Sequence, residues 1–172
     1  MRRHLPHLLL MAAIVLLDQV TKALIVRSLP LHGYVPLVDG LLSLSHVRNR
    51  GAAFGILSDW DLPYQTLLLS ALSLGALLAI AFYFVRLPAA ARLPRLALAF
   101  VLGGAVGNLL DRLRLGYVVD FVHVYWRNHQ WPDFNVADSA ITVGAILLVF
   151  STLTAPDRKS PRGAANKKEI SR

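Results

Sequence analysis

The chain contains no cysteine among its 172 residues. It therefore has no disulfide bond, no thiolate metal site and no cysteine nucleophile, although this absence leaves the redox compartment open. Its histidines lack the His-Glu-x-x-His spacing of zinc peptidases, and no Gly-x-Ser-x-Gly sequence is present. We therefore expect no metal ion and no other cofactor.

Acidic residues are scarce: 10 Asp and Glu stand against 18 Lys and Arg, for a net charge of +8. In a soluble protein this balance would suggest nucleic-acid binding. Here 55% of the residues are hydrophobic and the mean hydropathy is +0.52, with the apolar residues gathered in blocks. This distribution is typical of an integral membrane protein. We expect no nucleic-acid partner and interpret the basic residues as determinants of topology.

Four apolar blocks are each close to the length of about 20 residues that crosses a bilayer. Arg2 and Arg3 followed by apolar residues resemble a signal peptide, but no small-x-small cleavage site follows, so we interpret this block as a retained helix. We expect one all-α membrane domain over residues 1–155, with a small extracytoplasmic β element. The expected spans are residues 5–26, 66–85, 96–113 and 136–155.

The positions of the basic residues predict the orientation of the chain. They precede the first block, fill the link between the second and third, and follow the fourth. Because cytoplasmic loops carry an excess of Lys and Arg, these three regions belong in the cytoplasm. We therefore expect a multi-pass protein with both termini in the cytoplasm and a basic, disordered cytoplasmic tail over residues 156–172.

The first outer segment carries a hairpin signal. Asp39-Gly40 lies between the apolar runs 35–38 and 41–47. An Asp-Gly pair in this setting is typical of a tight turn between two strands. We expect this hairpin to rest on the outer membrane surface.

Asp120 and Asp138 each lie at the edge of an expected span. Ionisable groups at membrane depth are costly and usually mark a site or a pathway. Two carboxyl groups that meet cannot both ionise easily, and a pair that shares one proton can act as acid and base. An alternative is structural: Asn135 and Asp138 would only cap the fourth helix, and Asp120 would be an ordinary loop acid. Because the two occur together, we favour catalysis.

A polar stripe ends nearby. Gly104, Asn108, Asp111 and Arg112 share one face of the third helix. Arg112 could hold a phosphate or a peptide carbonyl. The alternative is polar contact between helices with a snorkelling arginine. Gly103, four residues before Gly107, predicts close approach of another helix.

Two further motifs leave alternatives open. Asp18 and Lys22 are four residues apart and therefore share a face of the first helix. They form either a structural ion pair or part of the site. The sequence Asn49-Arg50-Gly51-Ala52-Ala53-Phe54 is a polar turn followed by small residues and an aromatic near the second span. From the residues alone it could also be a plain loop that re-enters the membrane.

Taken in order, these motifs resemble the lipoprotein signal peptidase family, also called signal peptidase II. The resemblance covers the chain except its tail. Its motifs are residues 18–22, 49–54, 103–112, 118–121 and 134–138.

The resemblance implies an aspartic endopeptidase of the bacterial inner membrane. Its substrate would be a diacylglyceryl-modified prolipoprotein, its surroundings membrane lipids, and its inhibitor the cyclic peptide globomycin. The active site would face the periplasm. Asp120 and Asp138 would be the catalytic dyad. The substrate-binding residues would be Asn49, Gly104, Asn108, Arg112 and Asn135, with Asp18, Lys22 and Asp111 in support.

Other classes of function remain possible from the residues alone. The polar stripe could be an ion or proton pathway in a small membrane transporter or channel, although four spans are few and no repeat relates the two halves. A lipid-binding scaffold without chemistry is a third possibility.

Overall fold

The computed structural model describes residues 4–51 and 64–154. Within them, all four expected spans are helices long and apolar enough to cross a membrane. The prediction of four spanning helices with a small β element is therefore confirmed. The helices are α1 (Leu5–Ser28), α2 (Gln65–Arg86), α3 (Arg92–Leu115) and α4 (Val136–Leu153).

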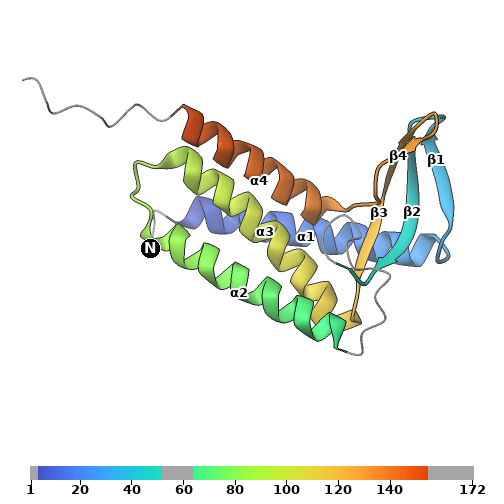
Figure 1. Cartoon of the computed structure of the whole chain (residues 1–172), viewed down its shortest axis with the longest axis horizontal. Helices are drawn as coiled ribbons and strands as arrows, with labels where there is room; N and C mark the ends of the chain where they lie inside the picture. The colour runs from blue at the N-terminus through green and yellow to red at the C-terminus, as the bar shows by residue number, and fades with distance from the viewer. Residues whose placement is uncertain (1–3, 52–63, 155–172) are drawn as a thin grey trace, which may run out of the picture.

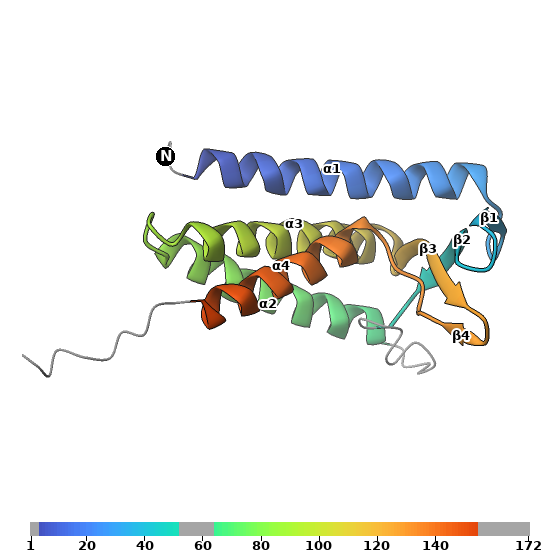
Figure 2. The same ribbon diagram turned by 90° about the horizontal axis from the view of Figure 1, so that it is seen from above.

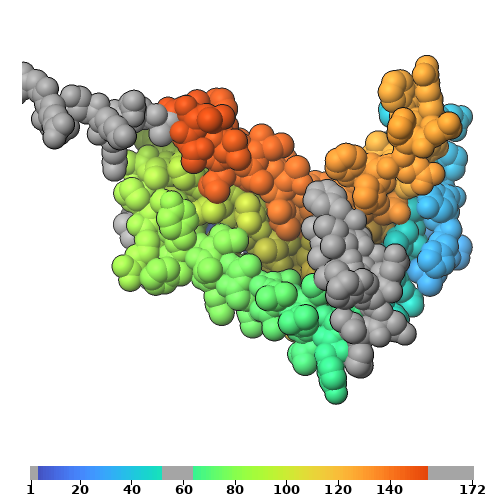
Figure 3. Space-filling model, in the orientation of Figure 1, coloured from blue at the N-terminus to red at the C-terminus, as the bar shows by residue number. Residues whose placement is uncertain are grey.

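Helix α3 is the centre of the bundle, because α1, α2 and α4 all pack against it. On the face seen in Figure 3, its surface lies between α4 and α2. Glycines allow the close contacts. A Cβ added at Gly103 would lie 3.1 Å from Ile14 of α1, and one at Gly107 would lie 2.7 Å from Asp18 Oδ2. The predicted close approach of another helix at these glycines is confirmed, and the partner is α1.

The sheet has four antiparallel strands in the order β1-β2-β3-β4. It lies at one end of the bundle (Figures 1 and 2). The start of α1 and the end of α4 are both at the opposite end. The strands are β1 (Tyr34–Val38), β2 (Leu42–Asn49), β3 (Val118–Trp126) and β4 (His129–Gln130).

The predicted hairpin is confirmed as β1 and β2. Its turn contains Gly40 at a φ of 76°, a left-handed conformation that glycine adopts without strain. Strand β3 was not predicted. It pairs with β2 so that Asp120 lies opposite Val47. Asp120 is therefore a residue of a central strand, and the alternative that it is an ordinary loop acid is wrong.

A polar cluster secures the sheet to the segment before α4. Ser45 on β2 donates to Asp133 Oδ1 at 2.8 Å, and His123 Nδ1 on β3 lies 3.0 Å from the same oxygen. Asp133 is two residues before the start of the α4 cap. The sheet and α4 are thus joined close to both aspartates of interest.

Candidate active site

Asp120 projects from β3 into a buried polar site, where only 2% of the residue is exposed. Asn49 Nδ2 donates to its Oδ2 at 2.9 Å. Asn135 Nδ2 donates to its Oδ1 at 2.7 Å. The carboxyl group is therefore held from both sides, by the end of β2 and by the residue that begins α4.

Asp138 has two roles in the structure. Its backbone N–H donates to Asn135 Oδ1 at 2.9 Å, and its Oδ2 accepts from Asn135 N at 3.2 Å, which together form a capping box. The structural alternative is thus correct as a description of the helix start. Its other oxygen, Oδ1, accepts from Asn108 Nδ2 at 2.7 Å. Capping therefore uses only one of the two carboxylate oxygens.

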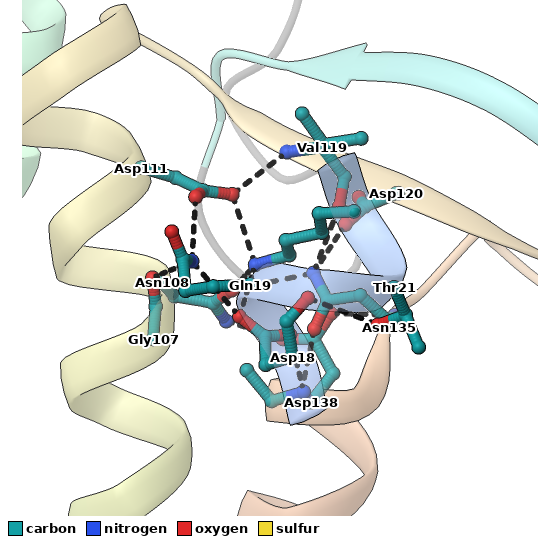
Figure 4. Close-up of polar contacts among 12 residues, drawn as sticks. Asp18, Gln19, Thr21, Gly107, Asn108, Asp111, Val119, Asp120, Asn135 and Asp138 are labelled. Carbon is teal, nitrogen blue, oxygen red and sulfur yellow. Dashed lines mark hydrogen bonds and ion pairs between the residues drawn. The ribbon is translucent and has the colours of Figure 1, made fainter. Parts of the chain in front are cut away.

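Two asparagines connect the two carboxyl groups. Asn135 Nδ2 bonds to Asp120 and also lies 3.2 Å from Asn108 Oδ1, while Asn108 Nδ2 bonds to Asp138. Figure 4 shows the acids on either side of these amides. Residues from β3, α3 and the start of α4 thus meet in one network.

Burial, and after it the charge of Asp138, raises the pKa of Asp120 to about 7. The hydrogen bonds from Asn49 and Asn135 and the charge of Lys22 oppose this rise. Asp120 can therefore keep its proton close to neutral pH. A carboxyl group with this pKa beside a second acid can donate or accept a proton at the working pH of most enzymes.

Lys22 occupies the centre of a buried ionic cluster. Its Nζ lies 2.8 Å from Asp18 Oδ2, 2.9 Å from Asp111 Oδ2 and 3.0 Å from Asn108 Oδ1. The ion pair expected within α1 is therefore present and also touches the site, through Asn108. Sequence reasoning did not single out Gln19, whose Nε2 donates to Asp111 Oδ1 at 2.9 Å. The only sequence signal for Gln19 is its position between Asp18 and Lys22, the two residues of the ion pair.

Arg112 points toward the end of β2. Its Nη2 donates to Gly51 O at 3.0 Å, and Gly51 N donates to Asn49 Oδ1 at 2.9 Å. The turn that starts at Asn49 therefore meets the polar stripe of α3. The rest of that motif, residues 52–54, lies outside the described residues.

Gly104 lies where α3 meets α4. A Cβ there would collide with Ala137 O and lie 2.8 Å from Ile141. Its position next to the start of α4 allows α3 to approach the helix that carries Asp138. Across residues 4–51 and 64–154 there is no group of three or more His, Cys, Asp or Glu that could hold a metal ion.

The chain is similar to known proteins along most of its length. The family model for signal peptidase II matches residues 10–154. A lipoprotein signal peptidase of Geobacter metallireducens is 46% identical over 149 residues, which cover 87% of this chain and 91% of that protein. One from Geobacter sulfurreducens is 48% identical over 147 residues, covering 84% and 89%.

Solved structures agree with the sequence comparison. A bacterial membrane enzyme determined at 2.3 Å resolution superposes with a TM-score of 0.77 at 28% identity, covering 92% of this chain and 93% of that one. A second, at 1.9 Å resolution, gives a TM-score of 0.76 at 27% identity, covering 88% and 94%. The chain is a multi-pass membrane protease that belongs to the signal peptidase II family.

Proposed function

We propose that the protein is an aspartic endopeptidase whose catalytic dyad is Asp120 and Asp138. It removes the signal peptide from prolipoproteins that carry a diacylglyceryl group. The observation that carries the proposal is the network in which Asn108 and Asn135 connect the two carboxyl groups. Family membership supports the peptidase activity and the prolipoprotein substrate. It gives no support to a transporter or channel.

The dyad supplies both an acid and a base. One carboxylate accepts a proton from water, and the oxygen of that water attacks the carbonyl carbon of the scissile peptide bond. The protonated partner donates its proton to the carbonyl oxygen, which gives a tetrahedral diol. The first carboxyl group, now carrying the proton from water, donates it to the leaving amine as the C–N bond breaks, and the partner regains a proton from a hydroxyl of the diol as the new carboxylic acid forms. The proton is shared, so the apparent pKa values belong to the pair of acids. The pKa of about 7 for Asp120 keeps one proton on the pair near neutral pH.

The amides around the dyad form the substrate-binding part of the site. Asn49, Asn108 and Asn135 have their donors directed at carboxyl oxygens, so they fix the positions of both acids. Arg112 now donates to the backbone oxygen of Gly51. Its planar fork of donors suits a second peptide carbonyl, that of the substrate.

The position of the site explains a need for a lipidated substrate. Asp120 is on a strand just beyond α3, and Asp138 is in the first turn of a spanning helix. A lipid anchor in the bilayer would hold a peptide at this depth. Binding of the lipid anchor, at a distance from the scissile peptide bond, thereby positions that bond at the dyad. Gly104 contributes by allowing α3 to lie against the start of α4.

We further propose that the protein lies in the bacterial inner membrane with both termini in the cytoplasm. The start of α1 and the end of α4 lie at the same end of the bundle, opposite the sheet (Figure 1). Basic residues precede α1, lie between α2 and α3 and follow α4 in the sequence, which favours the cytoplasm for this end. We therefore infer that the dyad is on the periplasmic side. A globomycin-type cyclic peptide would compete with substrate for this site.

A cleavage assay tests the proposed function. Detergent-purified protein is incubated with a diacylglyceryl-modified prolipoprotein, with the unmodified precursor as control. We expect the lipidated precursor alone to be shortened, and globomycin to prevent it. An unchanged lipidated precursor would contradict the proposal, since a transporter or a scaffold cleaves nothing.

A further inference from the structure

Two buried carboxylates outside the dyad each hold a backbone N–H beside a dyad residue. Asp18 Oδ1 accepts from Ala137 N at 2.9 Å, one residue before Asp138. Asp111 Oδ2 accepts from Val119 N at 3.2 Å, one residue before Asp120. The arrangement is the same on both sides, although one contact is made from α1 to α4 and the other from α3 to β3.

Lys22 connects these two carboxylates. Its ammonium group lies 2.8 Å from Asp18 and 2.9 Å from Asp111, and Lys22 is only 3% exposed. Buried charges are strongly unfavourable unless they are paired and hydrogen-bonded, so the three groups depend on one another. A single cation therefore fixes the distance between the two carboxylates, and through them the positions of the elements that carry the dyad.

We propose that Asp18, Lys22 and Asp111 are a positioning unit that sets both the register of the two dyad-bearing elements and the electrostatic field in which the dyad holds its proton. This inference rests on the proposed function, because it concerns the same aspartates. It assigns to the three residues a defined task at the reaction rather than a general contribution to stability. None of them touches the substrate in this account.

The charges of Lys22, Asp18 and Asp111 act on the proton of the dyad in directions that can be stated. Asp120 faces Asp138, Arg112 and Lys22, and the positive charge of Lys22 lowers the pKa of Asp120. Removing that charge leaves the carboxylates of Asp18 and Asp111 unneutralised, so the dyad should hold its proton more tightly. Removing the charge of Asp111 should have the opposite effect. Charges a few ångströms away in buried surroundings shift such a pKa by about one unit.

The experiment measures the pH dependence of kcat and of KM for prolipoprotein cleavage by the purified full-length chain. In Lys22→Gln we expect the alkaline midpoint of the kcat profile to move up by about one pH unit. In Asp111→Asn it should move down, with kcat reduced and KM little changed. The double variant removes one charge of each sign, so its midpoint should return toward that of the unsubstituted protein.

Two controls separate this role from a structural one. Arg27→Gln removes a positive charge from an exposed position of the same helix and should leave the midpoint unchanged. Lys22→Arg keeps the charge and should also keep the midpoint. A group that only stabilises the fold would lower the melting temperature and kcat without moving the midpoints in opposite directions.

Unchanged midpoints in folded Lys22→Gln and Asp111→Asn would overturn the inference. If Lys22→Gln does not fold, Asp111→Asn decides by itself, with a downward shift supporting the inference and no shift contradicting it. Failure of the proposed function looks different. In that case Asp120→Asn would cleave normally, whatever the behaviour of the Lys22 and Asp111 variants.

Discussion

Replacing Asp138 by asparagine separates its structural role from its catalytic one. The amide has almost the shape of the carboxyl group, and its oxygen can still accept from Asn135 N, as Asp138 Oδ2 does at 3.2 Å. Two contributions are lost. The negative charge at a helix N-terminus stabilises a helix by about 1 kcal/mol or less. The bond that Asp138 Oδ1 accepts from Asn108 Nδ2 is also lost, because the amide has only one oxygen, and an unpaired buried donor costs about 1–3 kcal/mol. We therefore expect Asp138→Asn to fold, with a free energy of unfolding lowered by about 2–4 kcal/mol.

The expected effect on turnover is much larger. Asparagine cannot exchange a proton with water or substrate, and general acid–base catalysis contributes about 10²–10⁴-fold to a rate. That factor corresponds to about 3–5 kcal/mol of transition-state stabilisation. A loss of about 2–4 kcal/mol in stability leaves most of a protein of ordinary stability folded, so it cannot account for such a decrease.

The assay combines single-turnover cleavage of lipidated prolipoprotein with thermal unfolding of the same sample. Ser139→Ala is the matched control, because Ser139 Oγ donates to Asn135 O at 2.9 Å in the same helical turn but carries no acid. It should cleave within about twofold of the unsubstituted protein, since only a neutral hydrogen bond is lost. Turnover by Asp138→Asn that also stays within a fewfold would show that Asp138 is only a cap, and would refute the reasoning.

Four further outcomes are expected. Activity should fall as pH rises through about 7, because the raised pKa of Asp120 keeps one proton on the dyad only below that pH; a rate that is constant from pH 6 to about 9 would argue against a shared proton. Arg112→Lys keeps a positive charge but loses the planar fork, so kcat/KM should drop well beyond about tenfold, whereas near-normal cleavage would make Arg112 a snorkelling anchor. Gly104→Ala should separate α3 from α4, because a Cβ would collide with Ala137 O, and should lower the melting temperature together with kcat; an unchanged melting temperature would contradict this packing. A reporter active only in the periplasm should give no signal when fused after Arg172, and a strong signal there would contradict the proposed orientation.

The spanning helices and the hairpin could be predicted because their signals are local. Apolar blocks of the right length predict helices in a membrane, and Asp39-Gly40 between apolar runs predicts a tight turn. The cap of α4 is local as well, since Asn135 and Asp138 are three residues apart. All three are confirmed by the structure.

Strand β3 could not be predicted in the same way. Its pairing partner, β2, is about 70 residues earlier in the chain, and Asn49 pairs with Val118. Asp120 also interrupts the apolar run that would have indicated a buried strand. An acid can be buried at this position of β3 because Asn49 and Asn135 donate to its two oxygens. These contacts are visible only in three dimensions.

The burial of polar side chains within the bundle could not be predicted from the sequence either. Arg95 was interpreted only as a basic residue of the cytoplasmic link, yet it is 1% exposed, and its Nη2 lies 2.7 Å from His4 Nδ1. Gln19 likewise has no spacing that separates it from an ordinary polar residue of α1. Such contacts depend on which helices become neighbours, which one sequence does not specify.

The most direct test of the central claim is cleavage of lipidated prolipoprotein by Asp120→Asn beside the unsubstituted protein at pH 7. We expect the unsubstituted protein to shorten the precursor and Asp120→Asn, while folded, to cleave it at least about 100-fold more slowly. Combining Asp120→Asn with Asp138→Asn should add little further loss, because the two acids act as a unit. Cleavage by folded Asp120→Asn at close to the normal rate would contradict the account.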